Sequence, residues 1–185
     1  MFLGSRIANH NKRTTTTTVT FRIDKNVMRK LRVEAKYRDV SLNTLVNQIF
    51  KNFADWYMFE PKVGMIPISK PVVIELFRNL NKDEIIDIAT RIGKSAIFDI
   101  ALFMKSKLDV DSFLTWLEAR MKSSSIEISH VTKNNNIHTY IIKHDICENW
   151  SLYQKTILEL IFHEVLRKDV NITTSETTLT IRLEK

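Results

Sequence analysis

The chain has 185 residues, a hydrophobic fraction of 44% and a formal net charge of +7. This length suffices for one or two domains with a packed core, and this composition excludes a chain that is disordered throughout. The single cysteine, Cys147, excludes an intrachain disulfide, no apolar stretch reaches the roughly 18 residues of a membrane span, and residues 1–13 lack the apolar core of a signal peptide.

These exclusions predict a cytoplasmic protein with no membrane partner. Its positive charge is concentrated in the first third of the chain. Residues 1–60 contain 11 Lys/Arg and 5 Asp/Glu, whereas residues 61–185 contain 17 and 16. A local basic block favours a polyanionic partner, because Lys and Arg displace condensed counterions from phosphates. The alternative is an ordinary solvated basic surface.

The first element in chain order is a flexible basic arm over residues 1–16. It carries Arg13 close to five consecutive threonines at positions 14–18. A compact unit is expected next, over residues 17–57.

This unit begins with a segment whose apolar and polar residues alternate, which predicts a strand with two different faces. One face carries Val19, Phe21 and Ile23. The other face carries Thr18, Thr20 and Arg22, whose hydroxyls and guanidinium can bond base edges or phosphates.

Two helices are predicted to follow the strand. Asp24 is the expected N-cap of a helix over 25–38, and Ser41 is the expected N-cap of a second helix over 42–57. A single strand cannot satisfy its own backbone donors, and forty residues make too small a core. Pairing two copies solves both problems, because two strands then form an antiparallel ribbon above four interlocked helices. The sequence therefore predicts a homodimer.

At these residues the sequence resembles the ribbon-helix-helix family of Arc/MetJ/CopG-type regulators. The matching run covers roughly residues 18–53, TVTFRIDKNVMRKLRVEAKYRDVSLNTLVNQIFKNF. Many family members have glycine in the turn before the second helix, whereas this chain has Arg38-Asp39-Val40, where Asp39 can adopt turn geometry.

The resemblance implies that a ribbon enters the DNA major groove. Thr18, Thr20 and Arg22 would then contact bases, while Ser41 and Asn43 would hold a phosphate at the start of the second helix. From their charge alone, Lys25 and Arg13 are expected to add salt-dependent affinity that is independent of sequence. The alternative is a β-α-α fragment of one larger domain with a solvated strand.

A linker is predicted over residues 58–71, because this segment contains all three prolines and one of the three glycines. Residues 72–185 are predicted to form an α+β domain for sensing or oligomerisation. Its sequence indicates helices with candidate N-caps at Ser69, Asn81 and Asp109. Strands over 126–132 and 137–143, a helix over 149–168 and an alternating strand over 177–184 are expected to follow. The complete chain is thus expected to be an α+β protein ending in a small antiparallel sheet.

No metal site, cofactor or catalytic residue is predicted, and the chain is not expected to be an enzyme. The weak metal candidates are His138, His144 and Cys147, which His130 would join after a turn of three or five residues. Isolated histidines on strands are more often structural. Gly93-Lys94-Ser95 lacks the upstream glycine of a phosphate-binding loop and is interpreted as a helix break.

The leading hypothesis is a sequence-specific DNA-binding transcriptional regulator that acts as a dimer or higher oligomer, with an unidentified small-molecule or metal effector as a possible further partner. Two alternatives remain open. The first is an antitoxin-like protein that binds another protein through its C-terminal part. The second is a general chromatin or partition protein, which would show little preference between DNA sequences.

Overall fold

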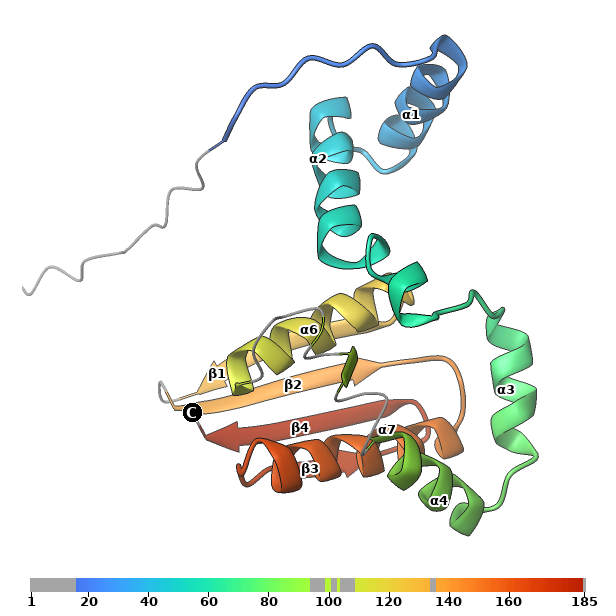
Figure 1. The fold of residues 1–185 in the computed structure, drawn as a ribbon, viewed down its shortest axis with the longest axis vertical. Helices are drawn as coiled ribbons and strands as arrows, with labels where there is room; N and C mark the ends of the chain where they lie inside the picture. The colour runs from blue at the N-terminus through green and yellow to red at the C-terminus, as the bar shows by residue number, and fades with distance from the viewer. Residues whose placement is uncertain (1–15, 94–98, 101–102, 104–108, 134–135, 185) are drawn as a thin grey trace, which may run out of the picture. The chain divides into compact units, whose positions relative to one another are not determined.

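The computed structural model describes residues 16–93, 99–100, 103, 109–133 and 136–184 (Figure 1). The chain divides into two compact units, Met1–Val46 and Asn47–Lys185. Over the described residues it is an α+β protein in which helices come first and a four-stranded antiparallel sheet follows. The predicted fold class is confirmed at this level. Residues 16–24 belong to no helix or strand of the single chain.

The first two helices begin where they were predicted to begin, and the second ends as an α-helix five residues before its predicted end. Helix α1 spans Lys25–Tyr37 and helix α2 spans Leu42–Asn52. The Asp24 carboxylate caps α1 by accepting the backbone N–H groups of Asn26 and Val27, at 2.8 and 3.2 Å. These bonds satisfy donors that have no partner within the helix.

The second unit begins inside α2, not after residue 71. After Asn52 the chain continues as a π-helical turn, η1 (Phe53–Tyr57), and Trp56 in this turn is buried in the core of the second unit. The expected boundary at residue 57 therefore does not separate two cores.

The segment over 58–71 is not an extended linker. It contains the 3-10 helix η2 (Glu60–Val63), and Phe59 and Met65 pack against the core. Pro61 lies in the first turn of η2, and Pro71 in the first turn of α3. Because a first-turn residue has no intrahelical N–H partner to lose, proline is compatible with helix at these positions.

Two further helices, α3 (Lys70–Arg78) and α4 (Lys82–Ile92), come next. Ser69 precedes α3 as expected, although its side chain makes no capping bond. Asn81 and Glu84 form a reciprocal capping box at the start of α4, so this cap is confirmed. Gly93 is the C-cap residue of α4, and a Cβ there would lie 3.4 Å from Leu160 Cδ1, at ordinary van der Waals distance.

Helix α6 (Val110–Ser123) begins at Asp109, which accepts the Ser112 N–H at 2.8 Å as expected. Helix α7 (Glu148–Leu160) continues into a second π-helical turn, η4 (Ile161–Val165).

The sheet consists of β1 (Glu127–Lys133), β2 (Ile137–Lys143), β3 (Asn171–Thr174) and β4 (Thr178–Glu184). Its strand order is β1-β2-β4-β3, and each neighbouring pair is antiparallel. The predicted hairpin and the predicted last strand are confirmed, whereas β3 was not individually predicted.

One face of the sheet forms the core with α6 and α7. Because partners in register share a face, Tyr140 lies beside Ile181 and Ile142 beside Leu179, and all four are buried. Helix α6 contacts β1, while α7 contacts β3 and β4, and α4 packs on α7. The aromatic side chains buried in this core include Phe113, Trp116, Trp150 and Phe162.

Helix α3 is attached to α7 by polar contacts that are far apart in sequence. The Asn149 side-chain amide donates to the backbone carbonyls of Phe77 and Leu80, both at 2.8 Å. The Lys70 ammonium pairs with the Asp145 carboxylate at 2.6 Å. The amide therefore satisfies carbonyls around the end of α3 that would otherwise need water.

Candidate nucleic-acid interface

The predicted ribbon residues lie in an extended, exposed segment. Thr18, Thr20 and Arg22 are all exposed. The apolar residues that alternate with them are exposed as well, with 61% of Val19, 57% of Phe21 and 39% of Ile23 accessible to solvent. The single chain therefore leaves both faces of this segment uncovered, including a face on which every residue is apolar.

The turn between the two helices is made without glycine, because Asp39 adopts the left-handed conformation. Asp39 has a φ of 52°, a left-handed conformation that aspartate tolerates better than most residues. The chain then reverses into Ser41, whose Oγ accepts the Thr44 N–H at 3.0 Å. Ser41 is thus confirmed as the cap of α2.

The expected phosphate-holding residues lie together at the start of α2. Ser41 and Asn43 are both exposed, so a ligand can reach this helix end. The Ser41 hydroxyl also lies 2.7 Å from the Thr44 hydroxyl. Because this hydroxyl already serves as the cap, phosphate binding here would rely on the helix dipole and on backbone N–H groups of the first turn.

The apolar faces of the two helices are only partly covered in the single chain. Ala35 of α1 and Leu45 of α2 are buried. The large apolar residues that share these faces remain substantially exposed, namely Val27, Ile49, Phe50 and Phe53. Such a face on a monomer commonly marks an interaction surface.

Helix α1 also presents a row of cations, which we call the α1 stripe. Its members recur at spacings of four, three and four residues, which places them on one side of a helix. They are Lys25, Arg29, Arg32 and Lys36, and all four are exposed. Glu34, the acidic residue of α1, pairs with Arg38 at the end of the helix and not with a member of the stripe. Lys25 was predicted to contact DNA, whereas its membership of a stripe was not. Arg13 lies outside the described residues.

The weak metal candidates do not come together. His138 and His144 lie near opposite ends of β2, about 20 Å apart at the usual rise of a strand. His144 is buried, and Cys147 precedes α7. Across the part of the chain that the structure describes, no three His, Cys, Asp or Glu side chains are grouped as a metal site. The set of His138, His144 and Cys147 is therefore wrong as a site.

His144 has a structural role between β2 and α7. Its Nδ1 accepts the Ile146 N–H at 3.3 Å, so its Nε2 carries the proton and donates to Ser151 Oγ at 2.7 Å. Burial lowers the pKa of the His144 imidazole, against the opposing effect of the Asp145 charge. A neutral histidine with both ring nitrogens engaged holds the start of α7 in place.

This geometry predicts a pH-dependent stability. The unfolded imidazole takes up a proton near pH 6.5, whereas the folded one resists protonation to lower pH. The contribution of His144 is therefore complete above about pH 6.5 and is lost as pH falls toward the lowered folded-state pKa. Urea unfolding at two pH values tests this role. The free energy of unfolding should fall less between pH 7.5 and pH 5.5 in His144→Gln than in the native chain. An identical loss in both proteins would contradict this role.

The acidic neighbour of His144 pairs with the first residue of α3. The Asp145 carboxylate bonds to Lys70, and this bond is the main reason that the pKa of Asp145 is lowered. The Lys94-Ser95 dipeptide lies outside the described residues.

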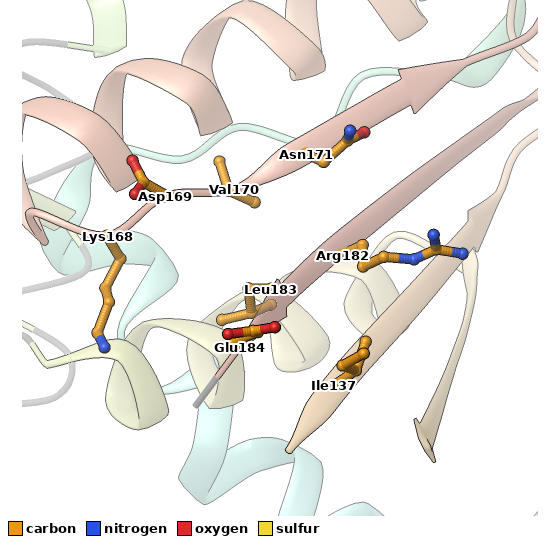
Figure 2. Close-up of a pocket in the computed structure, with 8 residues that line it drawn as sticks. All are labelled: Ile137, Lys168, Asp169, Val170, Asn171, Arg182, Leu183 and Glu184. Atoms are coloured by element: carbon orange, nitrogen blue, oxygen red, sulfur yellow. The ribbon is translucent and has the colours of Figure 1, made fainter. Parts of the chain in front are cut away.

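A pocket of about 490 Å³ lies where β2 and β3 begin and β4 ends. Figure 2 shows that the side chains of Lys168 and Arg182 extend to opposite sides of it, so these cations do not converge on one point. A second pocket of about 570 Å³ is lined by residues of the α2–η1 segment and of α6, with Lys51, Asp55, Glu118 and Lys122 among them. Neither set identifies a particular ligand.

No protein-family model and no curated protein matches the chain. Among the described residues, none of the helices combines the length and apolarity that a membrane crossing requires.

Proposed function

We propose that this chain is a sequence-specific DNA-binding transcriptional regulator whose residues 18–23 pair with those of a second copy. The proposal rests on one observation: an exposed segment with alternating faces precedes two capped helices, the first of which lies wholly in a separate compact unit. Pairing would add backbone hydrogen bonds between the two segments and would turn both apolar faces toward the helices. A two-stranded ribbon of this kind fits the major groove.

The polar face of the ribbon supplies the specificity in this proposal. Two copies would present four threonine hydroxyls and two guanidinium groups, from Thr18, Thr20 and Arg22 of each chain. Arg22 is the strongest candidate for base readout, because arginine makes paired hydrogen bonds to guanine. Threonine adds weaker hydrogen bonds and a methyl group that suits thymine.

The backbone of the DNA would supply most of the affinity. The exposed start of α2 at Ser41 and Asn43 offers a helix N-terminus to one phosphate. The α1 stripe adds four cations per chain at positions that no acidic residue of α1 neutralises by an ion pair. Phosphate contacts of this kind are independent of base sequence and weaken with salt.

The test is the selection of bound sequences from random double-stranded DNA, followed by a comparison of two arginine variants. We expect Arg22→Ala to reduce discrimination between selected and random DNA by about tenfold or more, because one bidentate contact contributes about 1–3 kcal/mol. Arg32→Ala, in the α1 stripe, is the matched control. This variant should weaken binding to selected and to random DNA equally, and it should lower the salt dependence of binding.

If Arg22→Ala discriminates between selected and random DNA as well as the native chain does, the ribbon does not read the base sequence. The same selection separates the alternatives. A recovered inverted or direct repeat supports a regulator, whereas a pool without a shared sequence supports a general chromatin or partition protein. The extensive core of residues 47–185 supports a folded sensing or oligomerisation domain over a C-terminal segment that folds only on a protein partner.

A further inference from the structure

Two histidines from neighbouring strands lie side by side on the sheet. Lys133 pairs with Ile137, which leaves three residues in the hairpin turn. With that register His130 lies opposite Tyr140, and His138 lies opposite Thr132, so both histidines project from the same face. Their Nε2 and Nδ1 atoms are 2.9 Å apart.

The pair is held by its surroundings and is open to solvent. The His130 ring stacks on Tyr140 with 4.2 Å between ring centroids and 4° between planes. The Thr132 hydroxyl lies 3.4 Å from His130 Nε2. His130 is exposed and His138 is half-buried, so a solute can reach both rings. The pairing of β1 with β2 fixes the backbone positions that carry the two rings.

We propose that His130 and His138 bind one Ni(II) or Cu(II) ion between strands β1 and β2. With metal–nitrogen bonds of about 2.0–2.1 Å, nitrogens 2.9 Å apart subtend an angle of about 90° at the metal. That angle suits neighbouring positions of square-planar or octahedral coordination. A tetrahedral Zn(II) site would need the nitrogens about 3.3 Å apart.

Binding replaces the proton that the two rings share in their hydrogen bond. The donor nitrogen gives up this proton while the other nitrogen of the same ring takes one up from solvent, so both rings stay neutral and both facing nitrogens turn a lone pair toward the metal. Since no third His, Cys, Asp or Glu joins the pair among the described residues, water completes the coordination. The ion would join β1, an edge strand, to its only neighbour in the sheet.

The test uses the untagged full-length protein with nickel chloride. We expect calorimetry to give one Ni(II) per chain and a raised thermal unfolding temperature, because the ligand binds the folded state. His130→Asn and His138→Asn should each weaken binding by about tenfold or more, as loss of one of two ligands requires. His163→Asn, at an exposed histidine in η4, and Cys147→Ser are controls that should bind as the native chain does.

A measurement on the native sequence does not depend on whether the variants fold. Paramagnetic Ni(II) should broaden the backbone amide signals around His130 and His138 before those of other segments. Broadening centred on Cys147 or His163, or affinity unchanged in both strand variants, would overturn the site. The site does not depend on DNA binding, so either proposal can fail without the other.

Discussion

Phe21→Asp is expected to abolish both dimerisation through residues 18–23 and specific DNA binding. In the proposed ribbon, Phe21 lies in the apolar layer between the strands and the helices, where an unpaired carboxylate costs more than about 3 kcal/mol. Because about 1.4 kcal/mol corresponds to a tenfold change, DNA affinity should fall by at least about a hundredfold. Fluorescence anisotropy with a selected DNA sequence measures this loss, and analytical ultracentrifugation measures assembly.

The matched control is Val33→Asp, which introduces the same charge at another exposed apolar residue. Val33 is 66% exposed, and it lies two positions before the buried Ala35, on the opposite side of α1. The new carboxylate would lie beside Arg29 and Lys36 of the α1 stripe, so we expect a small, salt-dependent loss of affinity that is equal for selected and random DNA, with dimerisation unchanged. If Phe21→Asp binds selected DNA as Val33→Asp does, the apolar face of the segment is not a dimer core and the ribbon proposal fails.

Trp116→Ala should produce the largest loss of stability in the second unit. Trp116 is 1% exposed, stacks on Phe113 at 5.6 Å and lies 6.3 Å from Trp56. The Arg120 guanidinium covers its ring at 5.4 Å. Removing this side chain leaves a large cavity at the centre of the core, and such replacements cost about 3–5 kcal/mol. Urea unfolding followed by near-ultraviolet circular dichroism measures the change.

Tyr37→Ala provides the comparison for Trp116→Ala, because it removes a large aromatic side chain that is 85% exposed. Its effect on unfolding should stay within about 0.5 kcal/mol, as is usual for surface positions. A loss of less than about 1.5 kcal/mol in Trp116→Ala would show that the second unit is not organised around α6. It would also weaken the assignment of Trp56 to that core.

Helix starts and alternating strands were predictable because their signals are local. Asp24, Asn81 and Asp109 each accept N–H groups of their own first turn, so a short sequence window contains the interacting atoms. The strand β4 likewise shows its buried face as an alternation of Leu179, Ile181 and Leu183. Such features need no knowledge of distant parts of the chain.

The segment over 58–71 was misassigned because its contacts are not local. Its prolines indicated an extended chain, yet two of them occupy first helical turns, and Phe59 and Met65 find apolar partners elsewhere in the second unit. The burial of Trp56 against Trp116 joins residues sixty positions apart. Periodicity in the sequence gives no information about such a pairing.

The histidines illustrate the same limit at a candidate site. Their proximity in sequence suggested a cluster of His138, His144 and Cys147, but a strand separates its two ends by its full length. The partner that does meet His138 is His130, and that contact depends on the length of the hairpin turn. The sequence left this length open, although a three-residue turn was among the possibilities that brought His130 to the right face.

The position of β4 has a consequence for biosynthesis. Although β4 comes last among the described elements, it lies between β2 and β3, so it joins the two parts of the sheet. Until the ribosome releases residues 178–184, the β1–β2 hairpin and β3 have no common neighbour. The first unit, Met1–Val46, is complete long before this point. With residues 18–23 paired as proposed, two nascent chains on one messenger RNA would associate through their N-terminal segments while their C-terminal units are still unfinished.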